Sequence, residues 1–146
     1  SNESYERRWT KSINDYATFY DDLDILLVPL KNEEFNKYKS ELKFIEASIK
    51  GVSVIASNVE PYSNIGINIL NKGGEINNIG NSILVDEHKG IKGWVNAIKK
   101  FVLNPELRLK SIENLKLLTN ESSEYNLTNI SKDRISFLKK ILLSND

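Results

Sequence analysis

The chain has 146 residues, 40% hydrophobic and 27% charged, which suits one globular domain with a sizeable core and excludes a disordered composition. Lysine and arginine total 20 and so do aspartate and glutamate, so the sequence lacks the basic surplus of dedicated nucleic-acid binders and membrane-surface proteins. The absence of cysteine excludes disulfides and thiolate zinc sites, no apolar run approaches the roughly 20 residues that span a bilayer, and we expect a cytoplasmic protein.

The first part of the chain is polar, and we expect residues 1–11 to be a leader outside the folded domain. The sequence contains no methionine, and Ser1–Asn2 resembles the remnant of a protease cleavage, so we interpret the chain as an excised fragment. Aromatic residues then recur at helical spacing and predict a helix over Ser12–Asp21.

A buried strand and a polar loop come next. Ile25–Val28 are four consecutive apolar residues stopped by Pro29, a pattern typical of strands that are covered on both faces in a parallel sheet. Lys31–Lys39 is polar and has no helical stripe, which predicts a loop.

A helix and a second strand complete a βαβ unit. Ser40 can act as the N-cap of a helix that runs to Lys50, and Gly51 is typical of a helix C-terminus. Val52–Ala56 is mostly apolar and predicts the second buried strand. This succession predicts parallel neighbours joined by a right-handed crossover.

A third strand and several helices follow a stretch without a clear pattern. Residues 57–82 are interrupted by glycines, whereas Ile83–Val85 predicts a short strand. Beyond them, helices are predicted over Ile91–Val102, from Asn104–Pro105 to about Leu118, and around Ile130–Leu142. The order predicts an α/β fold, with a Rossmann-like open parallel sheet flanked by helices over residues 12–120 and a helical C-terminal tail over residues 121–146.

Lysines stand at the start of the helix that follows the first strand. Lys39 precedes this helix and Lys43 lies in its first turn, where the helix dipole disfavours cations. An external anion such as a phosphate or diphosphate would make the arrangement favourable, because free N–H groups and lysines would then bind it together. The alternative is that Glu33, Glu34 and Glu41 neutralise these lysines in solvated pairs.

Glu46 lies at the margin of an apolar stripe on the same helix. The stripe of Leu42, Ile45 and Ile49 is expected to face the core. A carboxylate beside it needs hydrogen bonds, which the hydroxyls of a ligand diol could supply. The alternatives are that Glu46 bends outward into water or pairs with Lys50, four residues later.

Other candidate sites are weaker. His88, the only histidine, is expected to be a solvated loop residue, and a zinc site is disfavoured. Asp86 and Glu87 could bind a hard cation, but two acids in a loop are more typical of solvated surface. Gly73–Gly74 has neither a P-loop nor a dinucleotide-binding context.

An ordered succession of short segments resembles the donor-binding lobe of GT-B glycosyltransferases of the group 1 type. The resemblance covers about Tyr16 to Leu118. It is carried by DILLVPL from Asp24, FN at Phe35–Asn36, KS at Lys39–Ser40, LK at Leu42–Lys43, IEA at Ile45–Ala47 and GVSVIAS from Gly51. Further segments follow in the family's order: PY at Pro61–Tyr62, GNSILV from Gly80, WVNAI from Trp94 and NPELR from Asn104.

The resemblance implies roles for individual residues. Glu46 matches the second glutamate of the family's glutamate–seven–glutamate motif, which binds the ribose hydroxyls of the donor. Lys39, Ser40 and Lys43 would hold the donor diphosphate. Glu34 is the nearest counterpart of the first glutamate, the catalytic contact to the donor sugar, although its spacing from Glu46 is longer than in the family.

Phe35 and Asn36, in the same polar segment, are implied as further donor contacts. The family transfers a sugar, typically a hexose, from a nucleotide-diphosphate donor to an acceptor hydroxyl in bacterial glycan or polysaccharide biosynthesis. Helix N–H groups and lysines stabilise the leaving diphosphate, so no metal or other cofactor is obligatory.

The expected partners are the nucleotide sugar and an acceptor-binding lobe earlier in the full-length enzyme. Without that lobe we expect the fragment to be inactive, and any peripheral membrane association would come through the full-length enzyme. An alternative is a non-catalytic α/β regulatory or interaction domain of receiver-like architecture, but Asp24 begins its strand instead of ending it. Another is a degenerate lobe that only binds proteins.

Overall fold

The computed structural model describes residues 5–6, 8–9, 11–12, 14–120 and 123–143, so the expectation for Ser1–Asn2 lies outside the described residues. A three-stranded parallel sheet forms the centre, in the order β1-β2-β3. The strands are β1 (Ile25–Val28), β2 (Ser53–Ser57) and β3 (Ser82–Val85). The predicted α/β class with a parallel sheet flanked by helices is confirmed, and β2 lies one residue later than expected.

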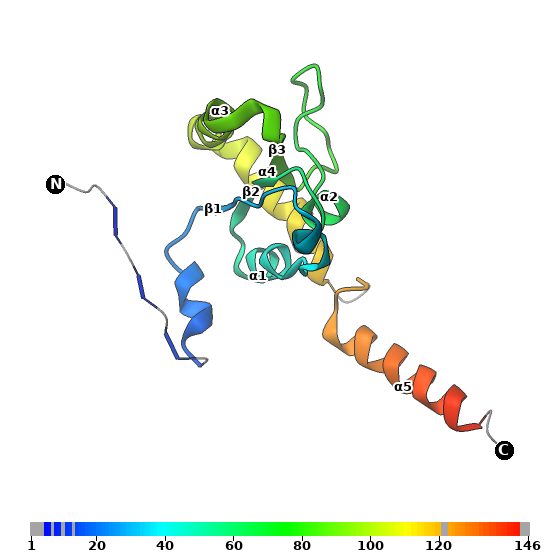
Figure 1. The fold of residues 1–146 in the computed structure, drawn as a ribbon. Coiled ribbons are helices and arrows are strands. Elements are labelled where there is room, and N and C mark those ends of the chain that lie inside the picture. Colours follow the sequence, from blue (N-terminus) through cyan, green and yellow to red (C-terminus); the bar gives the residue numbers. More distant parts are fainter. Residues whose placement is uncertain (1–4, 7, 10, 13, 121–122, 144–146) are drawn as a thin grey trace.

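Helices and single turns occupy most of the remaining chain (Figure 1). The α-helices are α1 (Leu42–Lys50), α2 (Tyr62–Ile65), α3 (Gly90–Leu103), α4 (Pro105–Lys116) and α5 (Leu127–Leu143). The 3-10 helices are η1 (Tyr16–Tyr20), η2 (Glu34–Tyr38), η3 (Glu87–Lys89) and η4 (Leu117–Thr119). Within the described parts of the chain, none of the helices has the length and apolar character to cross a membrane.

Two predicted elements are wrong in detail. The helix expected over Ser12–Asp21 is only the five-residue turn η1, and the loop expected over Lys31–Lys39 contains η2. In η2 the aromatic residues Phe35 and Tyr38 are exposed and the buried residue is Asn36, so no apolar stripe marks this turn in the sequence. The turn of η2 is held by a hydrogen bond from the Asn36 backbone N–H to the Glu33 carbonyl.

Two hydrophobic clusters lie on opposite faces of the sheet. β2 alternates between them, because Val54 and Ala56 pack into the cluster that contains Phe44 of α1, whereas Ile55 packs with Phe101 of α3. Figure 1 shows α1 and α3 on opposite sides of the strands. β2 is therefore buried on both faces, as predicted.

An asparagine-rich segment closes the outer edge of β3. The side chain of Asn68 accepts a hydrogen bond from the Leu84 backbone N–H at 2.7 Å. The Asn81 amide accepts from the Ile67 N–H at 2.8 Å and donates to the Ile65 carbonyl at 3.1 Å. The Asn68 amide and the backbone of Ile67 and Ile69, which bonds Ser82, thus take positions that a neighbouring strand would otherwise fill, while Asn81 braces the segment itself.

β1 forms the other edge of the sheet. It pairs with β2, and no other strand among the described residues pairs with it. Leu27 is 44% exposed, so the prediction that this strand is covered on both faces is wrong, because β1 lies at the edge of the sheet.

The C-terminal part is fastened to α1 before it leaves the domain. Ser48 donates from its hydroxyl to the Leu115 carbonyl at 2.9 Å and lies 2.8 Å from the Thr119 hydroxyl. Pro105 opens α4 at its first turn, as predicted. α5 then extends away from the sheet (Figure 1).

Candidate functional site

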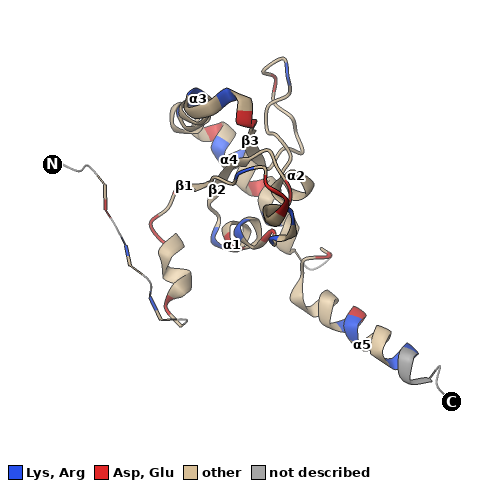
Figure 2. Cartoon of the chain, in the orientation of Figure 1, with Lys and Arg blue, Asp and Glu red and all other residues tan. Residues whose placement is uncertain are grey.

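The residues singled out in the sequence lie around η2 and the first turns of α1. β1 ends at Val28 and the chain passes through η2 into α1, so both elements lie beyond the carboxyl end of that strand. Open α/β sheets bind their ligands in this position. Figure 2 shows basic and acidic residues together here, so no single charge dominates the region.

The expected core face of α1 is wrong. Leu42 and Ile49 are 49% and 67% exposed, whereas Phe44 and Ala47 are fully buried against the sheet. Both sets recur at helical spacing, so periodicity alone does not distinguish them. The Phe44 ring buries the larger apolar area and faces the core, while Ile45 and Ile49 turn toward the C-terminal tail.

Four side chains from η1 and α1 form a polar cluster, which we call the Lys43–Glu46 cluster. The Lys43 ammonium lies 2.9 Å from Glu46 Oε2, 2.5 Å from the Tyr16 hydroxyl and 3.2 Å from the Tyr20 hydroxyl. Tyr20 also donates its own proton to Glu46 Oε2. A lysine ammonium has three donors, and this cluster uses all three.

The Glu46 carboxylate is held through one of its two oxygens. Both Lys43 and Tyr20 bond Oε2, and among the residues that the structure describes no donor reaches Oε1. The Glu46 side chain is 18% exposed, so Oε1 can still meet solvent or a ligand. The carboxylate is fixed in orientation yet keeps an acceptor open.

Protonation in the cluster follows from burial and hydrogen bonding. Burial raises the pKa of Tyr20, and its hydrogen bond to Glu46 raises it further. Burial by itself lowers the pKa of Lys43, but hydrogen bonds to Tyr16, Glu46 and Tyr20 together bring it above the ordinary value. Tyr20 is therefore neutral and Lys43 cationic at neutral pH.

Neither alternative partner set for these charges is observed. Lys50 pairs with Asp21 at 2.7 Å and not with Glu46. Glu33 pairs with Lys31 and Glu34 with Lys37, so the expectation that these acids neutralise the lysines at the start of α1 is wrong.

The start of α1 differs by one residue from the prediction. Its N-cap is Glu41, with no capping bond from that side chain, so the assignment of Ser40 as the N-cap is wrong. Ser40 and Lys39 are exposed, and the Lys39 ammonium lies 5.8 Å from the centre of the Phe35 ring. An uncapped helix start with an exposed lysine and hydroxyl remains there.

The candidate residues of η2 do not join the cluster. Glu34 has a side chain that is 71% exposed and bonds Lys37 at 2.7 Å. The Lys37 ammonium lowers the pKa of Glu34. Asn36 is buried and donates its amide to the Lys31 carbonyl at 2.9 Å, so it serves to close the loop.

The loop after β3 holds one of its two acids, Asp86, in bonds within the protein, while Glu87 is exposed. Asp86 accepts from Asn58 at 2.7 Å and pairs with Lys89 at 2.9 Å. The hydrogen bond from the Asn58 amide and, to a smaller extent, that from Lys89 lower the pKa of Asp86. His88 is exposed, as expected. Across residues 5–6, 8–9, 11–12, 14–120 and 123–143, no three His, Cys, Asp or Glu side chains gather as metal ligands.

Sequence reasoning missed the two tyrosines that complete the cluster. The helical spacing of the aromatic residues predicts that Tyr16 and Tyr20 belong to an apolar stripe, whereas the structure brings their hydroxyls to Lys43 of α1. Two tyrosines four residues apart, just before a buried strand, are the only local signal. Their contact with Lys43 spans 27 and 23 residues of sequence, which no local pattern reveals.

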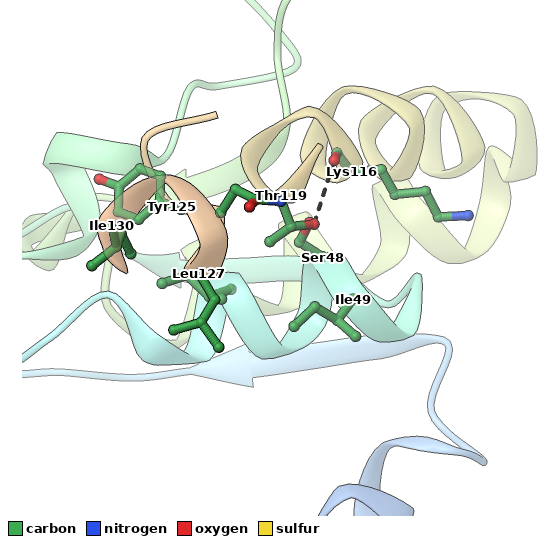
Figure 3. Close-up of a pocket in the computed structure, with 9 residues that line it drawn as sticks. Ser48, Ile49, Lys116, Thr119, Tyr125, Leu127 and Ile130 are labelled. Carbon is green, nitrogen blue, oxygen red and sulfur yellow. Dashed lines mark hydrogen bonds between the residues drawn. The ribbon is translucent and has the colours of Figure 1, made fainter. Parts of the chain in front are cut away.

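Two hollows were also missed. A cavity of about 600 Å³ lies between α1, η4 and the start of α5, and Figure 3 shows Leu127 nearest Ile49 of α1, with Ile130 farther away beside Tyr125. A cleft of about 510 Å³ runs between α3, β3 and residues 68–74. The residues that line the first hollow do not include Lys43 or Glu46.

Comparison with known proteins adds no relative. The chain matches no family model, no curated protein and no solved structure. The resemblance drawn from its short segments stays a prediction, and functional inference rests on the geometry of α1 and its neighbours.

Proposed function

We propose that this domain binds the nucleotide-diphosphate sugar donor of a glycosyltransferase, which transfers the sugar to an acceptor hydroxyl in glycan biosynthesis. One observation carries the proposal. Glu46 is a largely buried carboxylate held through Oε2, with Oε1 open, on the helix that starts beyond the carboxyl end of β1.

The chemistry of Glu46 suits a ribose. A vicinal diol presents two hydroxyl donors close together, and an ionised carboxylate is an acceptor with two lone pairs on each oxygen. Its hydrogen bonds to neutral hydroxyls are charge-assisted and stronger than those between neutral groups. Because Lys43 and Tyr20 already orient the carboxylate, ligand binding costs little further conformational entropy at Glu46.

The diphosphate would lie at the start of α1. Exposed Lys39 and Ser40 and the uncapped N–H groups there supply donors, and the helix dipole favours an anion. Lys43 contributes its charge and no direct bond, because Tyr16, Tyr20 and Glu46 already use its donors.

The donor sugar is assigned less directly. The resemblance gives the catalytic contact to Glu34, which is exposed on η2 and paired with Lys37, and Phe35 lies exposed beside it. Asn36 is engaged with the backbone and supports the loop. Transfer also needs an acceptor-binding lobe, so the domain alone would bind the donor without turnover.

Calorimetric titration with UDP and GDP tests the proposal. We expect one of them to bind, and Glu46→Gln to weaken it about tenfold, the equivalent of one charge-assisted hydrogen bond. Glu113→Gln is the matched control, because Glu113 is an exposed helical glutamate three residues from its lysine partner. No binding of either nucleotide at millimolar concentration, or equal loss in both variants, would contradict the proposal.

A further inference from the structure

Tyr20 combines a buried ring with a hydroxyl that reaches the candidate site. The residue is 5% exposed and packs in the cluster that contains Val28 and Phe44. Close packing leaves a buried ring one orientation. The hydroxyl is therefore held at Glu46 by the core of the domain, whereas an exposed side chain would have to be ordered by the contact itself.

Lys43 and Tyr20 act on the same atom. Both donate to Glu46 Oε2, and the Lys43 ammonium also bonds the Tyr20 hydroxyl at 3.2 Å. Rotation of the carboxylate would break both bonds at once. Oε1 therefore keeps one direction relative to α1. Among the described residues, no donor bonds this oxygen.

We infer that Tyr20 is a positioning residue that makes this site select ribose over 2′-deoxyribose. The inference rests on the proposed function, which puts a ribose at Glu46. By fixing Oε2, Tyr20 aims Oε1 at the diol, so that both hydroxyls can donate to one oriented oxygen. A 2′-deoxy ligand leaves part of this acceptor unused, and the bond it loses is charge-assisted.

The second tyrosine supplies a control within the same cluster. Tyr16 accepts from Lys43 at 2.5 Å, whereas the hydroxyl that bonds Glu46 is that of Tyr20, and Tyr16 is 37% exposed. Tyr16→Phe removes a hydroxyl from the Lys43 ammonium without releasing the carboxylate. A role that only supports the lysine would make the two tyrosines equivalent, whereas a role in aiming Oε1 separates them.

The test measures dissociation constants by calorimetry for UDP and GDP, each beside its 2′-deoxy form, with wild type, Tyr20→Phe and Tyr16→Phe. For wild type we expect about tenfold preference for the ribonucleotide, as for one charge-assisted hydrogen bond. In Tyr20→Phe the ribonucleotide should weaken about fivefold while the deoxynucleotide stays near its wild-type affinity. Tyr16→Phe should keep the preference.

Each other outcome overturns the inference. Equal weakening of both nucleotides by Tyr20→Phe would mean that Tyr20 only supports the fold. Equal affinity of the wild type for the ribonucleotide and the 2′-deoxynucleotide would mean that the site does not bind the 2′-hydroxyl, with the proposed function still standing. Binding of neither nucleotide would overturn both. Circular dichroism checks folding of Tyr20→Phe, and Glu46→Gln, which leaves the core intact, must also lose the preference.

Discussion

The two segments that carry the candidate residues contain the same ion pair in different surroundings. In η2, Lys37 lies 2.7 Å from Glu34, and in α1, Lys43 lies 2.9 Å from Glu46, with the partners three positions apart in the sequence in both cases. The glutamate side chains are 71% and 18% exposed, respectively. The shorter pair is the more solvated one, so distance alone does not identify a pair that matters.

What separates the segments is the layer behind each pair. η2 lies at the surface, where Phe35 is 77% exposed, whereas Phe44 in α1 is fully buried. Solvent screens a pair such as that of η2 and competes for its bonds. In α1, tyrosines from η1 replace water around the charges, which gives the carboxylate a fixed direction.

Truncation of the two phenylalanines should produce the largest contrast. Phe44→Ala removes a ring from the core and should lower the free energy of unfolding by about 4 kcal/mol. Phe35→Ala, the matched control, should leave it unchanged within error. Urea denaturation of both variants provides the measurement. A similar loss in both would mean that η2 is packed as tightly as α1.

Neutral replacement of the two lysines should give the next largest difference. Lys43→Met leaves a largely buried carboxylate with one donor fewer and should cost about 1.5 kcal/mol, after allowance for the partial exposure of the pair. Lys37→Met should not shift the denaturation midpoint measurably. If both variants shift the denaturation midpoint equally, Tyr16 and Tyr20 do not strengthen the Lys43–Glu46 ion pair.

High pH should weaken the α1 side of the comparison further. The pKa of Tyr20 is raised above its ordinary value of 10.0, so above that pH the unfolded chain loses the proton first and the free energy of unfolding falls. We expect a decline of a few tenths of a kcal/mol per pH unit from this group after solvent screening. Below pH 10.0 the shift has no effect on stability.

Tyr20→Phe isolates this contribution, because burial also raises the pKa of Tyr62 and Tyr125. Stability measured by urea denaturation at a series of pH values from 8 to about 11 should therefore decline less steeply in the variant than in wild type. Parallel curves would show that the Tyr20 hydroxyl is already solvated in the folded protein.

The smallest expected effect concerns Glu34. The Glu34 side chain is exposed and bonds Lys37 instead of the Lys43–Glu46 cluster. Glu34→Gln should therefore leave both the stability measured in urea and the affinity for UDP or GDP unchanged. A loss confined to the matching nucleotide sugar would place Glu34 at the donor sugar, as the resemblance implies. A loss of affinity for the nucleotide itself would erase the contrast between the two glutamates.

The sequence predicts the framework of the fold well because the framework is built from continuous apolar patterns. Ile25–Val28 and Ile83–Val85 are short runs bounded by polar or turn residues, and Pro105 marks the start of α4 as expected. η2 escapes prediction because its buried residue is the polar Asn36, whereas its aromatic residues face solvent. α1 misleads because it has two apolar sides, of which only one meets the sheet.

The site is predictable only in part. Lys43 and Glu46 attract notice because each is unusual for its place in a helix. Their mutual pairing and their bonds to Tyr16 and Tyr20 depend on how η1 folds back onto α1. Such contacts arise from tertiary packing, which single-sequence periodicity does not contain.

The two edges of the sheet differ in whether a further strand can be added to them. At β3, the Asn68 amide accepts from the Leu84 N–H, and the backbone of Ile67 and Ile69 bonds Ser82, so an added strand would have to displace this segment. At β1, the outward N–H and C=O groups have no strand partner among the described residues, and unpaired strand edges act as templates for further strands. Any enlargement of this sheet is therefore directional, and it begins beside β1, the strand that leads into the helix bearing Glu46.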